Sequence, residues 1–222
     1  TAHPFADAPC ESQPQPFERR VSGALRGLAT DEFCERALTF VLRVKGRLMA
    51  SAFSHAFVAL ALGKAAPHPI MTWQVLLLGM TCSTVPDLDI IGFYFGIQYG
   101  DLWGHRGMTH SLLFAGLLSA ALVAIWYRQK EKAAQVGIFV YLFLCTASHG
   151  VLDAMTDGGL GIAFFSPFDS TRYFFPFRPV AVSPIGIGQF FSLDALRMLA
   201  SEVAWIWAPS IGLLLISHIL RR

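Results

Sequence analysis

Five predominantly apolar runs, separated by polar connections, constrain the fold of this chain more than any other feature. They cover about residues 50–63, 70–85, 111–127, 134–148 and 203–220, and a membrane-spanning helix needs about 20 such residues. Hydrophobic residues make up 54% of the chain and charged residues only 14%, whereas a soluble domain carries about a quarter of its residues as charges. We therefore expect an all-α, polytopic membrane bundle of about five apolar helices, with 111–127 and 203–220 spanning most easily.

The charge balance argues against nucleic acid as a partner. The formal net charge is only +2, and a domain that binds a duplex needs a basic patch able to neutralise several phosphates. The sequence contains no such patch, and its cysteines have no CxxC spacing that would indicate a thiolate metal site. The lipid bilayer is the partner that this composition predicts.

Two segments do not fit the pattern of spanning helices. Residues 1–48 hold several prolines and little periodicity, so we interpret them as a partly disordered N-terminal extension with an amphipathic helix over 31–47. The membrane-embedded domain is then predicted over 49–222. Residues 158–192 are dense in Phe, Pro and Gly, which interrupt spanning helices and suit an interfacial excursion that covers a site.

Ionisable residues cluster at the ends of the apolar runs, and each is informative because a charge at membrane depth is costly. If successive helices alternate in direction, the ends of the second and fourth runs lie at the same membrane face as the starts of the first and third. The candidate metal ligands that would converge there are His55, Asp87, Asp89, His105, His110, His149 and Asp153.

The residue types in this set indicate the chemistry. His149 and Asp153 are four residues apart, so on a helix they share one face and can chelate one ion or bridge two. Mixed imidazole and carboxylate ligands suit zinc, with manganese or iron as alternatives, and three carboxylates permit two or three ions. Such ions would activate a water for attack on a phosphoester.

Three further residues are candidates for catalytic roles. Arg106 is expected to clamp a phosphate, because a planar guanidinium matches phosphate oxygens bidentately. Asp157 follows the His149 to Asp153 stretch and is expected to contact the metal ligands without binding the metal itself. Glu202 precedes the last apolar run and remains open as a ligand, a general base or an interface anchor.

Four segments together carry a family resemblance: His55, PDLD at 86–89, HRGMTHS at 105–111 and SHGVLDAMTDG at 148–158. They resemble the YdjM-type family of inner-membrane metal-dependent hydrolases, which is distantly similar to zinc-dependent phospholipase C and the single-strand-specific zinc nucleases. The resemblance implies phosphoester hydrolysis, a bacterial inner-membrane location, and ligand roles for the seven candidate residues. A LexA-type regulator is a partner by this family resemblance only.

These observations predict a multi-pass metal-dependent hydrolase that cleaves a phosphoester of a lipid or lipid-linked substrate. A non-catalytic scaffold or regulator-binding protein with a structural metal site is the alternative, and a metal-ion transporter is disfavoured because polar residues stop at one face. Membrane orientation is open. The Arg128–Lys132 loop and the Arg221–Arg222 end favour an extracytoplasmic site, whereas Arg43, Lys45 and Arg47 favour the reverse.

Overall fold

Every regular element in residues 52–66, 70–182 and 193–222, the parts of the chain that the computed structural model describes, is helical. Two isolated bridges, Thr156 with Val180 and Ile162 with Tyr173, are the only strand-like pairings among them. The predicted all-α bundle is confirmed. The helices are α3 (Ala52–Ala65), α4 (Trp73–Cys82), η1 (Val85–Phe95), η2 (Met108–His110), α5 (Leu112–Trp126), α6 (Lys132–Ala154), α7 (Leu193–Glu202), η4 (Val203–Trp207) and α8 (Ala208–Leu220).

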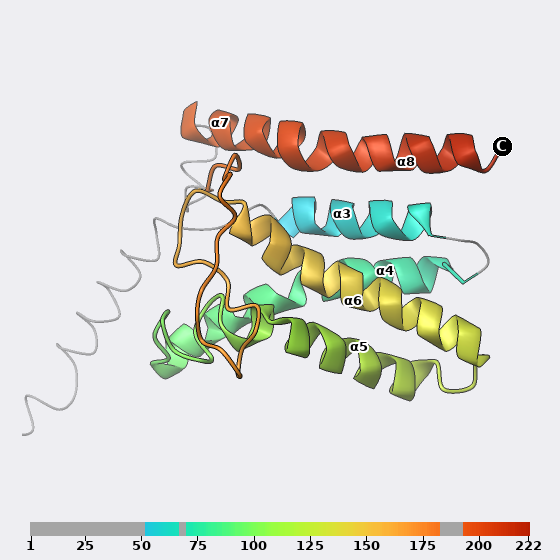
Figure 1. The fold of residues 1–222 in the computed structure, drawn as a ribbon, viewed down its shortest axis with the longest axis horizontal. Helices are drawn as coiled ribbons and strands as arrows, with labels where there is room; N and C mark the ends of the chain where they lie inside the picture. Colours follow the sequence, from blue (N-terminus) through green and yellow to red (C-terminus); the bar gives the residue numbers. More distant parts are fainter. Residues whose placement is uncertain (1–51, 67–69, 183–192) are drawn as a thin grey trace, which may run out of the picture. The chain divides into compact units, whose positions relative to one another are not determined.

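Helix α6 is the central element of the bundle. It contacts α3, α4 and α5, while α8 packs against α3 on the other side (Figure 1). Consecutive helices run in alternating directions, so the starts of α3 and α5 lie at the same end as the ends of α4 and α6 (Figure 1). The candidate site and the irregular segment 155–182 are both at this end, which we call the site end.

Close packing in the bundle depends on small residues opposite one large side chain. The ring of Tyr141 on α6 fits between α3 and α4, where its hydroxyl donates to the carbonyl of Ala59 at 3.1 Å. A Cβ added at Gly63 or Gly79 would collide with that ring. In lipid, where helices gain little from excluding water, such close approach is a main source of helix association.

Within the described part of the chain, three helical stretches are long and apolar enough to cross a membrane: Trp73–Phe95, Lys132–Ala154 and Leu196–Leu220. The prediction for 203–220 agrees with this, whereas the helix predicted at 111–127 forms but is too short to be one of these stretches. Helix α5 has 15 residues, which is about 22 Å at 1.5 Å per residue and shorter than the hydrocarbon core. It begins at Leu112, where the Ser111 side chain caps it by accepting from the amide of Phe114 at 3.1 Å.

The second apolar run changes helix type part-way. Helix α4 ends at Cys82, and the hydroxyls of Ser83 and Thr84 donate back to carbonyls of its last turn. Pro86 then lies in the first turn of η1, a 3₁₀ helix of 11 residues. Runs of 3₁₀ helix longer than a few residues are uncommon and often mark functional positions.

The segment after α6 is irregular, as the Phe, Pro and Gly content of 158–192 predicts. It is attached to the site end by backbone bonds, among them Phe175 to the carbonyl of Ala154 at 3.0 Å. Arg172 anchors it further, donating to the carbonyls of His105 and Tyr99. Residues 183–192 and the predicted extension 1–48 with its helix at 31–47 lie outside the described residues.

Candidate metal centre

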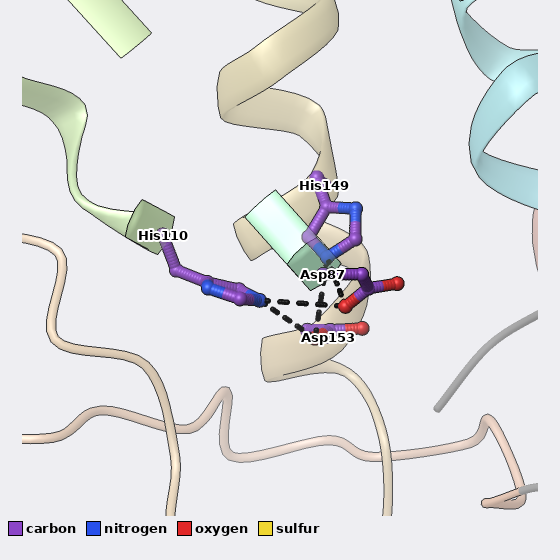
Figure 2. Close-up of side chains that lie close together, drawn as sticks. All are labelled: Asp87, His110, His149 and Asp153. Atoms are coloured by element: carbon purple, nitrogen blue, oxygen red, sulfur yellow. Dashed lines mark ion pairs between the residues drawn. The ribbon is translucent and has the colours of Figure 1, made fainter. Parts of the chain in front are cut away.

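Four side chains from three elements place one donor atom each within 4.8 Å of one another: Asp87 on η1, His110 on η2, and His149 and Asp153 on α6. We call them the ligand group (Figure 2). The Nε2 atom of His149 lies 3.2 Å from Asp87 Oδ1 and 3.7 Å from Asp153 Oδ2. His110 Nε2 lies 3.6 Å from the same Asp153 oxygen and 3.8 Å from Asp87 Oδ1. The two imidazoles and two carboxylates thus point at one common volume.

The atoms that face this volume are buried and have no hydrogen-bond partner. They are Asp87 Oδ1, His110 Nε2, His149 Nε2 and Asp153 Oδ2. Leaving a buried polar atom unsatisfied costs about 1–3 kcal/mol, more for a charged group. Since a cation at the common volume would satisfy all of them, the residues present fit a divalent metal ion.

The other nitrogen of each ligand histidine is already held. His149 Nδ1 lies 2.7 Å from the carbonyl oxygen of Ser83, and a carbonyl can only accept. The Nδ1 atom must therefore carry the proton, which leaves the Nε2 lone pair directed at the ligand group. This is the arrangement in which proteins fix the tautomer of a metal-binding histidine.

His110 is held by Asp89. Its Nδ1 lies 3.2 Å from Asp89 Oδ2, and the Thr109 hydroxyl donates to the same oxygen at 2.6 Å. Three carboxylates surround the His110 ring: Asp153 and Asp87 oxygens lie 3.6 and 3.8 Å from its Nε2, in addition to Asp89 beside its Nδ1. The carboxylates of the site therefore favour a positive charge between them.

Asp89 and His105 are close to the ligand group but differ from its members in their bonding. With His110 they form a second set whose atoms could hold an ion, yet His105 Nδ1 already lies 2.6 Å from Asp89 Oδ1. The backbone amide of Arg106 also donates to Asp89, at 3.3 Å. We interpret Asp89 as the residue that orients His110, and direct ligation by Asp89 and His105 stays a prediction.

His55 lies at the edge of the ligand group without belonging to it. Its ring stacks on that of His149 with 3.9 Å between centroids, and its Nε2 lies 3.6 Å from Asp153 Oδ1. Both ring nitrogens are buried and have no hydrogen-bond partner. The predicted ligand role is therefore compatible with its position, as is acceptance of a proton.

Arg106 is placed differently from the phosphate clamp that the sequence predicts. Its side chain is only 1% exposed, and its two Nη atoms donate to the Gly158 carbonyl at 2.7 Å and the Thr156 hydroxyl at 3.0 Å. Its Nε lies 3.5 Å from Asp153 Oδ2. The guanidinium is thus occupied by protein acceptors and neutralises part of the charge of Asp153.

Neither Asp157 nor Glu202 is brought into the ligand group. Asp157 is exposed and accepts from the amide of Val182 at 2.9 Å, which holds the irregular segment in place. Glu202 is buried and accepts a hydrogen bond from the hydroxyl of Ser54, the residue before His55, at 2.6 Å. Asp157 points away because α6 ends at Ala154, so the helical spacing from His149 does not continue to it.

The residues that hydrogen-bond to Asp89, His149 and Arg106 were not predicted from the sequence. Thr109 bonds Asp89, Ser83 accepts from His149, and Thr156 accepts from Arg106. Ser and Thr are common in connections, so their type alone carries no signal. Only their position inside or beside the quoted motifs, as with Thr109 in HRGMTHS, could have drawn attention to them.

Comparisons with known proteins agree with this architecture. The model of a family described as YdjM inner membrane protein matches residues 49–222. The chain belongs to the YdjM inner membrane protein family. It is also similar to the inner membrane protein YbcI of Escherichia coli (strain K12), with 32% identity over 170 residues that cover 75% of this chain and 95% of that protein. No solved structure matches the chain.

Family membership and the apolar helices together support a location in the inner membrane. The matched range begins at residue 49 and therefore contains every member of the ligand group. The site is thus part of the segment that this chain shares with the family, rather than of the preceding residues.

Proposed function

We propose that this member of the YdjM family is a metal-dependent hydrolase of the inner membrane that cleaves a phosphoester of a lipid or lipid-linked substrate. The observation that carries the proposal is the set of unpartnered, buried imidazole and carboxylate atoms at one common volume. Zinc suits this donor set best, with manganese or iron as alternatives. When bound, such an ion supplies Lewis-acid chemistry that polarises a phosphoryl oxygen and acidifies water.

The protein residues have separate tasks in this proposal. Asp87, His110, His149 and Asp153 would hold the ion, and Asp89 keeps the Nε2 atom of His110 directed at it. His55, whose ring nitrogens are unpartnered, is placed to accept a proton or to serve as a further ligand. The Nδ1 atoms of His110 and His149 are held by Asp89 and by the Ser83 carbonyl, which gives these two ligands the fixed orientation that a preorganised site requires.

The exposed fractions of the ligand-group side chains indicate how a substrate would reach the site. The side chain of Asp87 is 22% exposed, whereas those of His110, His149 and Asp153 are 0% exposed. A substrate phosphoryl group would therefore reach the centre past Asp87. The lipid part of the proposal is supported by the inner-membrane family and by the apolar surface beside this opening, where Leu88 is exposed.

Metal analysis combined with an activity panel tests the proposal. The purified protein and the variants Asp153→Asn and Asp169→Asn would be analysed for bound metal, and assayed on phosphomonoesters, phosphodiesters and phospholipids in mixed micelles. Asp169 is the matched control, because it is a partly exposed acid outside the ligand group whose partners are Thr171 and Tyr173. We expect Asp153→Asn to lose metal and hydrolysis together while Asp169→Asn keeps both.

Two results would contradict the proposal in different ways. If stable wild-type protein contained no metal, the ligand group would not be a metal site and the proposal would fail. Bound metal without turnover on any substrate, and without an exchangeable coordination position, would favour the alternative of a structural metal in a scaffold.

A further inference from the structure

The exposed residues of η1 form a straight apolar stripe. In a 3₁₀ helix, side chains three residues apart lie above one another. Leu88, Ile91 and Tyr94 have this spacing and are 59%, 52% and 79% exposed. Pro86 and Asp89, on the neighbouring face, are buried. The helix is therefore divided along its length into a buried face that supports the site and a face whose side chains are more than half exposed.

The depth of the site follows from helix lengths measured from the opposite end of the bundle. That end is marked by exposed Trp126, Arg128, Lys130 and Lys132, the aromatic and basic residues that favour a membrane interface. From Trp126, α5 extends only about 22 Å, while the hydrocarbon core is about 30 Å thick. Along α6, His149 is about 25 Å from Lys132.

His110 immediately precedes α5. Measured from the opposite end, the ligand group therefore lies several ångströms inside the hydrocarbon boundary at the site end. Some protein element must fill the remaining depth with an apolar surface. η1 meets this need, since it completes the apolar stretch Trp73–Phe95 and extends beyond the start of α5 at the site end (Figure 1). The first charged exposed residue after it is Asp101.

We propose that the stripe of Leu88, Ile91 and Tyr94 contacts the acyl chains of the leaflet at the site end, so that the ligand group lies below the membrane surface. Asp87, the exposed member of the ligand group, is next to Leu88 at the inner end of this stripe. An amphiphilic substrate would then enter sideways from the leaflet. This last step rests on the proposed function, whereas the lipid contact does not.

Quenching of a fluorescent label tests the depth of the stripe. Cys10 and Cys34 would be replaced by serine, and the buried Cys82 and Cys145 kept. A polarity-sensitive label would be attached singly to Ile91→Cys, to Leu215→Cys on the exposed side of α8, and to Gly100→Cys, where a Cβ would meet open space. The full chain would be reconstituted in vesicles of phosphatidylethanolamine and phosphatidylglycerol, with and without bromine on the acyl chains.

We expect the label at residue 91 to behave like the one at residue 215, losing most of its emission to brominated chains and little to aqueous iodide. The label at residue 100 should show the opposite pattern. If residue 91 follows residue 100, the site end is in water and the inference is overturned. Protection from both quenchers would mean that protein covers the stripe, which overturns it equally. Metal content and hydrolysis are not part of this readout, so the proposed function can fail or hold independently.

Discussion

Both carboxylate oxygens of Asp89 have hydrogen-bond partners, and this separates Asp89 from the acids of the ligand group. His105 Nδ1 lies 2.6 Å from Oδ1, and the Thr109 hydroxyl lies 2.6 Å from Oδ2. The atoms of Asp87 and Asp153 that face the ligand group have no such partners. A carboxylate that binds the second nitrogen of a ligand histidine typically tunes metal affinity without touching the metal.

The variant Asp89→Asn tests this difference. We expect it to weaken metal binding by about 10–100-fold, the usual effect of losing a carboxylate behind a ligand histidine, whereas Asp153→Asn should lose the metal altogether. Competition with a chromophoric chelator measures both affinities, and Asp169→Asn serves as the unaffected control. An Asp89→Asn defect as severe as that of Asp153→Asn would instead identify Asp89 as a direct ligand.

The guanidinium of Arg106 makes bonds that a lysine could not reproduce. Replacing it with lysine keeps the charge but cannot maintain bonds to both Gly158 and Thr156. Because leaving a buried acceptor without its donor typically costs about 1–3 kcal/mol, we expect Arg106→Lys to be less stable than wild type in detergent even without substrate. Thermal unfolding followed by circular dichroism measures this, with Arg178→Lys, an exposed arginine, as the matched control. Unchanged stability together with a raised KM would restore the phosphate-clamp interpretation.

Among the elements, the junction between α3 and the last helical stretch has an unusual local structure. Glu202 ends α7 and is followed by η4, a single stretch of π-helix from Val203 to Trp207. The Ser54 hydroxyl donates to Glu202 at 2.6 Å and accepts from the indole nitrogen of Trp207 at 2.9 Å. Ser54 therefore links both sides of the π-helical turn to the start of α3, and π-helical turns of this kind are frequent at functional sites.

The variant Ser54→Ala removes this link with little change in volume. It leaves the Trp207 indole without this acceptor and takes one donor from buried Glu202, which typically costs about 1–3 kcal/mol. We expect a lower unfolding temperature in detergent but unchanged stoichiometry of bound metal, because no atom of Ser54 belongs to the ligand group. Ser217→Ala, which loses only a bond to its own helix, controls for serine removal. Metal loss at unchanged unfolding temperature would contradict this assignment.

For the whole molecule, the apolar runs and helix alternation were sufficient to predict the bundle and the meeting of His110, His149, Asp87 and Asp153 at one end. Those predictions depend on hydrophobic periodicity and on the cost of charge in lipid, both of which can be read from a single sequence. The burial and the hydrogen-bond partners of an individual side chain cannot be read from it. Arg106 was therefore expected to face substrate although it faces Thr156, and the 3₁₀ geometry of η1, which turns Asp87 and Asp89 to opposite nitrogens of His110, could not be foreseen.

Orientation in the membrane is the remaining property of the whole molecule that charge can predict. The end opposite the site carries Arg128, Lys130 and Lys132, and Arg221 binds the carbonyls at the end of α3 there. Basic residues next to spans favour the cytoplasm, so we expect the site end to face the other side of the membrane. Green fluorescent protein fused after Arg222 should then be fluorescent, and an alkaline phosphatase fusion at the same point inactive. The basic residues Arg43, Lys45 and Arg47 predict the reverse pair of results, which makes the two fusions decisive between the competing charge signals.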